Sequence, residues 1–264
     1  MLYSASRRTD MPAFHPDVIV ERVSRSRRLE GLVLWTKDIR NLAFHHELRG
    51  VVENVPTVVQ YTVTGLAGGD WEPRVPPLLE QLPALREVAR MLPPGAVCWR
   101  FDPIIPGLDL WRRFREVKKH LEECLGALDG VTTSFADPYR KAVTRSRQAG
   151  LEWPAVDRAA KERIIAMMAG EFARKWSPPR PGFRPVRLCC EPELLTLPGV
   201  GMAHCIDGGL FERLYGLPLG DLAKDSGQRL ACGCVKSTEI GSYDMICGHG
   251  CLYCYANPDI YNEQ

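Results

Sequence analysis

Three cysteines near the end of this 264-residue chain, Cys247, Cys251 and Cys254, are spaced C-x3-C-x2-C. Three thiolates on one short loop can each bind one iron of a cubane cluster, which leaves the fourth iron open to a non-protein ligand. A structural zinc site needs a fourth ligand, for which His249 is the local candidate. Its place inside the first spacer makes His249 an awkward co-ligand. The spacing therefore favours a 4Fe–4S cluster over zinc.

A second group of cysteines lies in the same part of the chain: Cys190, Cys205, Cys232 and Cys234. Four thiolates complete a zinc site or bind every iron of a cubane. The C-x-C spacing is shorter than the usual zinc knuckle but occurs in iron–sulfur ligation. Cys190 is preferred over Cys189 because adjacent strand residues point to opposite faces. The group predicts a second 4Fe–4S cluster, with a zinc site or unliganded thiols as alternatives.

Residues 1–190 alternate between short apolar runs and amphipathic stretches. The runs favour strands over Leu2–Ser6, Gly31–Thr36, Pro56–Thr62, Ala96–Phe101, Val131–Phe135 and Pro185–Cys190. Helical periodicity predicts helices over 77–91, 111–128 and 156–176, with Asp157 or its neighbour capping the last. Parallel strands need crossover connections, so strands that alternate with helices favour a parallel sheet.

We therefore expect an α/β fold, specifically a partial or distorted (β/α) TIM-like barrel of about six units. A doubly wound open sheet is the alternative. Residues 1–190 would form the barrel-like core, and residues 191–264 a cysteine-rich, iron–sulfur-binding segment packed on the barrel mouth, in a single compact domain. The Pro-rich stretch Ser177–Pro185 reads as a loop rather than a domain boundary.

Polar side chains end each of the expected strands, and the sites of barrel and open α/β folds form at the carboxyl ends of strands. The catalytic candidates are Arg8, Asp10, Lys37, Arg100, Asp102 and Glu191, and the cofactor-binding candidates are Gln60 and Thr62. An Arg–Asp pair is most often a structural ion pair. Together, however, the arginines could bind a carboxylate or phosphate, which predicts an anionic substrate. Arg145 and Arg147 are expected on the solvated surface.

The charge balance is nearly neutral, with 34 Lys and Arg against 32 Asp and Glu and a net charge of +2. That bias is too weak to indicate a nucleic-acid or membrane partner. No apolar stretch approaches the roughly 18 residues of a membrane span, and the first residues do not read as a secretory leader. We expect a cytoplasmic protein, whose reducing surroundings keep its thiols free as metal ligands.

The full string CGHGCLYCYAN resembles the signature of radical S-adenosylmethionine (SAM) enzymes. The resemblance implies that Cys247, Cys251 and Cys254 hold a 4Fe–4S cluster and that Tyr253 contacts the adenine side of SAM. In that superfamily SAM chelates the fourth iron, and one electron cleaves it to methionine and a 5′-deoxyadenosyl radical. A small-molecule substrate and an external one-electron donor, such as a ferredoxin or flavodoxin, are the implied partners.

The superfamily normally carries this loop after the first strand of its barrel, whereas here it lies at the other end of the chain. From SASRRTDMPAFH through WTK, QYTVTG, WRFDPII and CGC to HGCLYCYAN, the chain resembles the domain of unknown function eighteen-forty-eight family over nearly its full length. The C-terminal cysteines of that family are similar to the radical SAM loop. The resemblance implies a permuted order, in which the tail returns to cap the barrel mouth.

The leading hypothesis is a radical SAM-type iron–sulfur enzyme that acts on an anionic small substrate. One alternative is a non-catalytic iron–sulfur or zinc-binding protein for electron transfer or sensing. A nucleic-acid-modifying radical enzyme is the other, and the near-neutral charge gives it little support.

Overall fold

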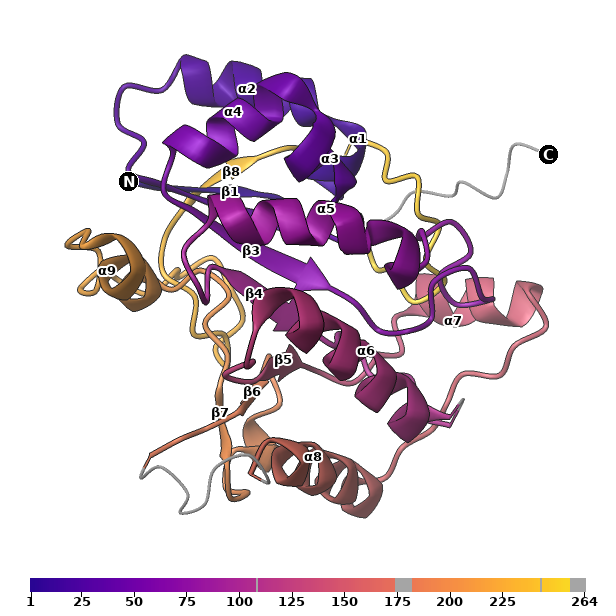
Figure 1. Ribbon diagram of the computed structural model, residues 1–264. Helices are drawn as coiled ribbons and strands as arrows, with labels where there is room; N and C mark the ends of the chain where they lie inside the picture. The colour runs from indigo at the N-terminus through magenta and orange to yellow at the C-terminus, as the bar shows by residue number, and fades with distance from the viewer. Residues whose placement is uncertain (108, 174–181, 243, 257–264) are drawn as a thin grey trace.

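A single parallel sheet organises the molecule (Figure 1). The computed structural model describes residues 1–107, 109–173, 182–242 and 244–256. These residues form an eight-stranded sheet in the order β7-β6-β5-β4-β3-β2-β1-β8, and every neighbouring pair is parallel. The strands are β1 (Leu2–Ala5), β2 (Gly31–Thr36), β3 (Thr57–Thr62), β4 (Val97–Arg100), β5 (Val131–Thr133), β6 (Val186–Leu188), β7 (Val200–Met202) and β8 (Thr238–Ile240). The expected α/β class is confirmed.

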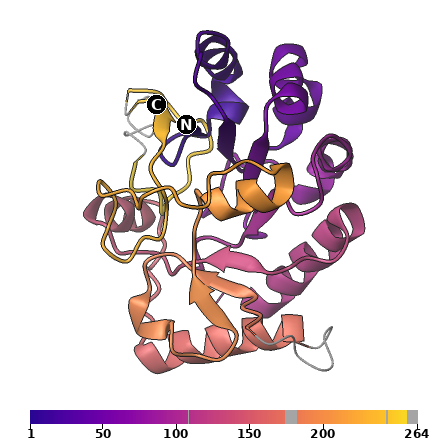
Figure 2. The ribbon, with the colours of Figure 1, turned by 90° about the vertical axis from the view of Figure 1, so that its left-hand side faces the viewer.

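Two of the eight strands, β7 and β8, were not expected from the sequence. Each has three residues, and neither lies in a longer apolar run such as those that revealed the equally short β5 and β6. β8 pairs with β1 in the register Tyr3↔Thr238 and Ala5↔Ile240, so the end of the chain returns beside its beginning. Figure 2 shows this segment of the tail next to the first strand. The expected six strands all form and follow the expected boundaries to within about two residues.

Helices connect the strands and flank the sheet (Figure 1). They are α1 (Met11–Phe14), α2 (Pro16–Ser24), α3 (Arg40–Phe44), α4 (His46–Asn54), α5 (Leu78–Met91), α6 (Leu110–Leu125), α7 (Arg140–Gln148), α8 (Arg158–Ala173) and α9 (Gly208–Tyr215), with a 3-10 turn at Pro192–Leu194. The three expected helices are present as α5, α6 and α8. The Asp157 carboxylate accepts a hydrogen bond from the Ala160 amide at 2.6 Å, as its predicted capping role requires. Residues 174–181, which hold most of the expected Pro-rich loop, lie outside the described residues.

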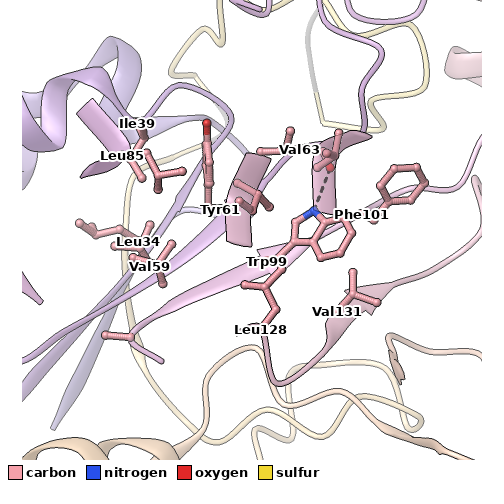
Figure 3. Close-up of a cluster of buried hydrophobic side chains, with 14 of the residues drawn as sticks. Leu34, Ile39, Val59, Tyr61, Val63, Leu85, Trp99, Phe101, Leu128 and Val131 are labelled. Carbon is pink, nitrogen blue, oxygen red and sulfur yellow. Dashed lines mark hydrogen bonds between the residues drawn. The ribbon is translucent and has the colours of Figure 1, made fainter. Parts of the chain in front are cut away.

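The central strands β2 and β3 are buried at all six of their positions, as strands covered on both faces are. On the outer face, Tyr61 and Trp99 pack among aliphatic side chains beneath the helices (Figure 3). The polar atoms of both side chains are hydrogen-bonded. The Trp99 indole donates to the Val63 carbonyl at 3.1 Å, and the Tyr61 hydroxyl donates to Gln81 Oε1 at 2.9 Å. On the inner face, Trp35 belongs to a buried cluster that includes Cys205, Cys232 and Cys234.

No helix in the described part of the chain combines the length and the apolar composition that crossing a bilayer requires.

The backbone before β5 approaches the backbone before β6 closely at Gly130. Its φ is 151°, and a Cβ there would lie 2.1 Å from the Pro185 carbonyl oxygen, which accepts the first β5 hydrogen bond. We expect Gly130→Ala to lower the free energy of unfolding by about 3 kcal/mol, because backbone must shift. Gly126→Ala is the control: its φ is 76° with no atom within 4 Å of the added Cβ, so only a cost of about 1 kcal/mol is expected. Urea denaturation measures both, and equal losses would contradict the close approach.

Candidate functional site

A pocket of about 490 Å³ opens at the carboxyl ends of the strands. In Figure 1 the arrow of β3 points to the side where the yellow tail descends, and α9 lies on the other side. Residues that follow β1, β2, β4, β5, β6 and β7 line the pocket together with the tail after β8. The expected site residues among them are Arg8, Asp10, Lys37, Thr62, Arg100, Asp102, Tyr253, Cys190, Cys205, Cys232, Cys234, Cys247, Cys251 and Cys254.

The Asp10 carboxylate holds the tail against the first two strands. Its Oδ2 atom accepts hydrogen bonds from the Lys37 amide at 2.6 Å, from Thr36 Oγ1 at 3.1 Å and from His249 Nε2 at 2.7 Å. Its Oδ1 atom caps α1 by accepting from the Ala13 amide at 3.1 Å. A carboxylate accepts only, so the hydrogen of the His249 ring lies on Nε2. His249 is 2% exposed and anchors the loop through this bond.

Three further contacts fix the tail loop. The Leu252 amide donates to the Trp71 carbonyl at 3.1 Å, and the Thr9 hydroxyl to the Met245 carbonyl at 2.9 Å. The Arg145 guanidinium donates to the Cys254 carbonyl. Arg145 is 5% exposed, so its expected place on the solvated surface is wrong. The helix α7 that carries Arg145 packs beside the tail, which the chain order alone does not reveal.

Lys37, Glu72 and Tyr253 form a buried charged group at the edge of the pocket. Lys37 Nζ lies 2.9 Å from Glu72 Oε1 and 5.5 Å from the centre of the Tyr253 ring, whose hydroxyl donates to the same carboxylate. Burial alone would lower the pKa of Lys37, but the charge of Glu72 and its hydrogen bond, together with Cys251 and Asp102, outweigh burial and raise that pKa. Burial would raise the pKa of Glu72, but Lys37 and the Tyr253 hydroxyl lower it. Both groups are therefore charged at neutral pH.

The three tail cysteines form no disulfide and line one pocket. Burial raises the pKa of Cys247 to about 11 and that of Cys251 well above its usual value. The backbone amides of Asp10 and His249 donate to the Cys247 sulfur, and this favours its thiolate. Among the described residues, no three His, Cys, Asp or Glu side chains converge as ligands of a single metal ion do. Cysteines of a cubane bind different irons, so that convergence is not required of them.

Five thiols from the second region line the same pocket: the four expected cysteines and Cys189. The preference for Cys190 over Cys189 assumed that the strand continues, but β6 ends at Leu188 and Cys190 has a φ of 60°. The turn lets both side chains reach the pocket. Hydrogen bonds to Cys189 and Cys234 raise the pKa of Cys205, as does burial.

Arg100 and Asp102 lie at the end of β4 as an ion pair, with Ser134 Oγ donating to Asp102 Oδ1 at 2.6 Å. The other guanidinium nitrogen of Arg100 lies 2.7 Å from Cys205 Sγ. Burial acts to lower the pKa of Arg100, but the nearby Cys205 and Asp102 raise it well above its ordinary value. Asp102 therefore orients Arg100 toward the sulfur.

Two expected site residues lie outside the pocket. The Glu191 carboxylate accepts from the Phe135 amide at 2.9 Å and pairs with Lys161 at 2.8 Å, so it ties α8 to the end of β5. Gln60 is two residues before the end of β3 and donates to the Cys205 carbonyl at 2.9 Å. It lines a cavity of about 760 Å³ toward the amino ends of β4 and β5. Both side chains face structural partners.

Sequence reasoning missed Glu72 and set Cys189 aside. It placed Arg7 after the first strand with Arg8 and Asp10 but did not select it as a site residue. Glu72 follows a Gly-rich stretch that reads as an ordinary turn, and nothing in its spacing indicates a partner. Arg7 precedes Arg8, which was chosen instead, yet the Arg7 guanidinium lies against the Trp35 ring at 5.4 Å and hydrogen-bonds Cys234. Cys189 could have been included from the sequence, because it is adjacent to the chosen Cys190 at the end of the same expected strand.

Residues 19–256 match the family model described as Domain of unknown function (DUF1848). The chain belongs to this family. No curated protein and no solved structure gives a match. The DUF1848 match spans all but the first of the strands and every pocket cysteine, so the sheet and both cysteine groups fall within one family unit.

The Asp10 anchor predicts a specific effect of Asp10→Asn. The amide nitrogen introduced in place of one oxygen would face donors, so we expect a loss of about 2–3 kcal/mol in the free energy of unfolding. Hydrogen exchange in the segment 245–254 should become faster, because the His249 bond is lost. Asp17→Asn, at a side chain that is 87% exposed, is the matched control and should change neither. Unaltered exchange in the tail of Asp10→Asn would show that Asp10 does not hold the loop.

Glu72→Gln should destabilise the protein in a pH-dependent way. The pKa of Glu72 is lowered on folding, so its stabilisation is present above the ordinary value of 4.5 and is lost as pH falls through the folded pKa. The pKa of Lys37 is raised, so its stabilisation is lost only as pH rises beyond 10.5. The free energy of unfolding of Glu72→Gln should therefore be about 3 kcal/mol lower than that of the wild type from about pH 5 to 10. This deficit should become smaller below about pH 4.

Urea denaturation at several pH values measures this deficit. Glu53→Gln, at an exposed carboxylate that pairs with Arg49, should show a small deficit that does not vary with pH in this way. A Glu72→Gln deficit of constant size down to about pH 3 would mean that the ion pair is not its cause.

Proposed function

We propose that this DUF1848 protein is an iron–sulfur enzyme of the radical SAM type that acts on a small anionic substrate. The observation that carries the proposal is the position of Cys247, Cys251 and Cys254, which line the same strand-end pocket as Arg8 and Lys37. A metal centre and cationic side chains thus share one space, as a reaction on a bound anion needs.

The topology supports a permuted partial (β/α) barrel. β8 lies at the edge of the sheet beside β1, so the tail loop follows an edge strand, as the radical SAM loop follows the first strand of its barrel. Cysteines that follow β6 and β7 come from the opposite edge of the sheet, yet they line the same pocket as the tail. A sheet whose two edges reach one pocket must curve toward closure.

The residues present fit a cluster with one open iron. None of the three thiols is used in a disulfide, and backbone amides donate to the Cys247 sulfur. Hydrogen bonds to cysteine sulfurs are among the features that tune iron–sulfur clusters. When bound there, a cluster with SAM supplies a radical that abstracts a hydrogen atom from the substrate.

The chain's own side chains would bind and orient the ligands. Lys37, fixed by Glu72, keeps a positive charge at the pocket wall beside the Tyr253 ring. At the rim, Tyr139 and Tyr255 lie with ring centroids 5.6 Å apart and offer apolar faces to a planar group such as adenine. Leu252, 3% exposed, helps to exclude water from beneath the loop.

The proposal is tested by anaerobic reconstitution with iron and sulfide, followed by reduction with dithionite in the presence of SAM. We expect 5′-deoxyadenosine to form and the electron paramagnetic resonance (EPR) spectrum of the cluster to change when SAM is added. The Cys247→Ser/Cys251→Ser/Cys254→Ser variant should lose both. Cys124→Ser, on the remote helix α6, should keep both.

A wild-type chain that carries iron but gives neither 5′-deoxyadenosine nor a SAM-dependent spectral change would contradict the proposal. That result would favour the non-catalytic iron–sulfur alternative.

A further inference from the structure

The second group of thiols is assembled from three separate segments of backbone. Cys189 follows β6 and its amide donates to the Thr133 carbonyl at 2.9 Å. Cys205 follows β7, and the Cys232–Cys234 loop is held by the Asp225 amide, which donates to the Cys234 carbonyl at 2.9 Å. Each segment is fixed by the sheet or by backbone pairing, so the sulfurs are brought together by the fold.

The sulfurs lie close together but do not surround one point. Cys205 contacts Cys189 and Cys234, and Cys234 in turn contacts Cys232. Among the described residues, no three of these cysteines converge as the ligands of a single metal ion do. The ligands of a cubane bind different irons and need no such common point. Cys190 contacts Cys189 and faces Arg229.

Two guanidinium groups face these thiols. Arg100 is 6% exposed and reaches Cys205 Sγ, while its other nitrogen pairs with Asp102. Arg7 hydrogen-bonds Cys234, and its Nη2 atom is buried without a hydrogen-bond partner. Asp102 balances one of these two cations. Arg100 is buried and Arg7 is half-buried. Cations that face neutral thiols away from water are costly, so the arrangement favours a further anionic group in this place.

We propose that Cys189, Cys205, Cys232 and Cys234 bind a second 4Fe–4S cluster with every iron ligated by protein, and that Arg7 and Arg100 balance its negative charge. Four thiolates around a cubane form an anionic group, which meets the unbalanced guanidinium charge. Full ligation makes this cluster a one-electron carrier rather than a binding site for SAM. The inference does not depend on the cluster of the tail.

Iron, sulfide and zinc analysis of anaerobically reconstituted full-length protein tests the site. We expect about eight irons in the wild type, about four in the Cys247→Ser/Cys251→Ser/Cys254→Ser variant, and about four in Cys205→Ser/Cys232→Ser/Cys234→Ser. The tail variant should also give, after dithionite reduction, an EPR signal that SAM does not alter. Cys124→Ser is the control and should keep about eight irons.

The outcomes separate this inference from the proposed function. About four irons in the wild type and none in the tail variant would overturn the second cluster and leave the tail cluster standing. About four in the wild type and four in the tail variant would support the second cluster while the tail cluster fails. About one zinc per chain that is lost only with Cys205, Cys232 and Cys234 would overturn the iron assignment. Should that triple variant not fold, the tail variant's iron count alone decides.

Three single substitutions test the ligand set and the charge balance. Cys189→Ser, made in the tail variant, should lower the iron content, whereas Cys190→Ser should not; the reverse would overturn the choice of Cys189. Arg7→Gln in the same background should keep the iron but lower the midpoint potential of the cluster, because a positive charge stabilises the reduced form. An unchanged potential would overturn the role of Arg7.

Discussion

One buried carboxylate ties together the parts of the molecule that form the pocket. Asp10 follows β1, and its two oxygens accept from the backbone after β2, from the first turn of α1 and from His249 in the tail loop. A charged group at 7% exposure is tolerable only because donors surround it. The position of the tail cysteines therefore depends on Asp10 being correctly placed by the first strand. The pairing of β8 with β1 brings His249 within its reach.

The parallel sheet explains why so many reactive side chains share one space. Every strand ends on the same side, so the residues after each strand are neighbours there although they are far apart in sequence. The tail cysteines follow the edge strand β8, whereas Cys190 and Cys205 follow β6 and β7 at the opposite edge, and all of them line the pocket. Curvature of the sheet, rather than proximity in the chain, sets the relation between them.

The sequence reveals residue types and long periodic elements, and it does not reveal long-range partners. The helix α6 and the strand β3 were predictable because their patterns extend over many residues, whereas the three residues of β8 carry no periodicity. The spacing of the thiols predicted two groups of ligands, and the cysteines of both groups line one pocket. The His249–Asp10 bond joins residues 239 positions apart and could not be predicted. Gln60 was wrongly expected to line the strand-end pocket. Alternation along β3 predicts which face of the sheet the side chain points to, but it does not predict how far along the strand the pocket begins.

The charges around the pocket are distributed unequally between the two sulfur groups. Near the tail, Glu72 balances the charge of Lys37. The charge of Lys37 therefore stays balanced whether the tail cysteines are neutral or ionised. Near the second group, Arg7 and Arg100 share only the Asp102 carboxylate among the contacts described. Metal binding deprotonates thiols, so a bound cluster would supply the missing negative charge at the second group. The guanidinium groups would then lower the electrostatic cost of adding an electron there, which suits an electron carrier, whereas the paired charges around the tail suit a site that must admit a separate ligand.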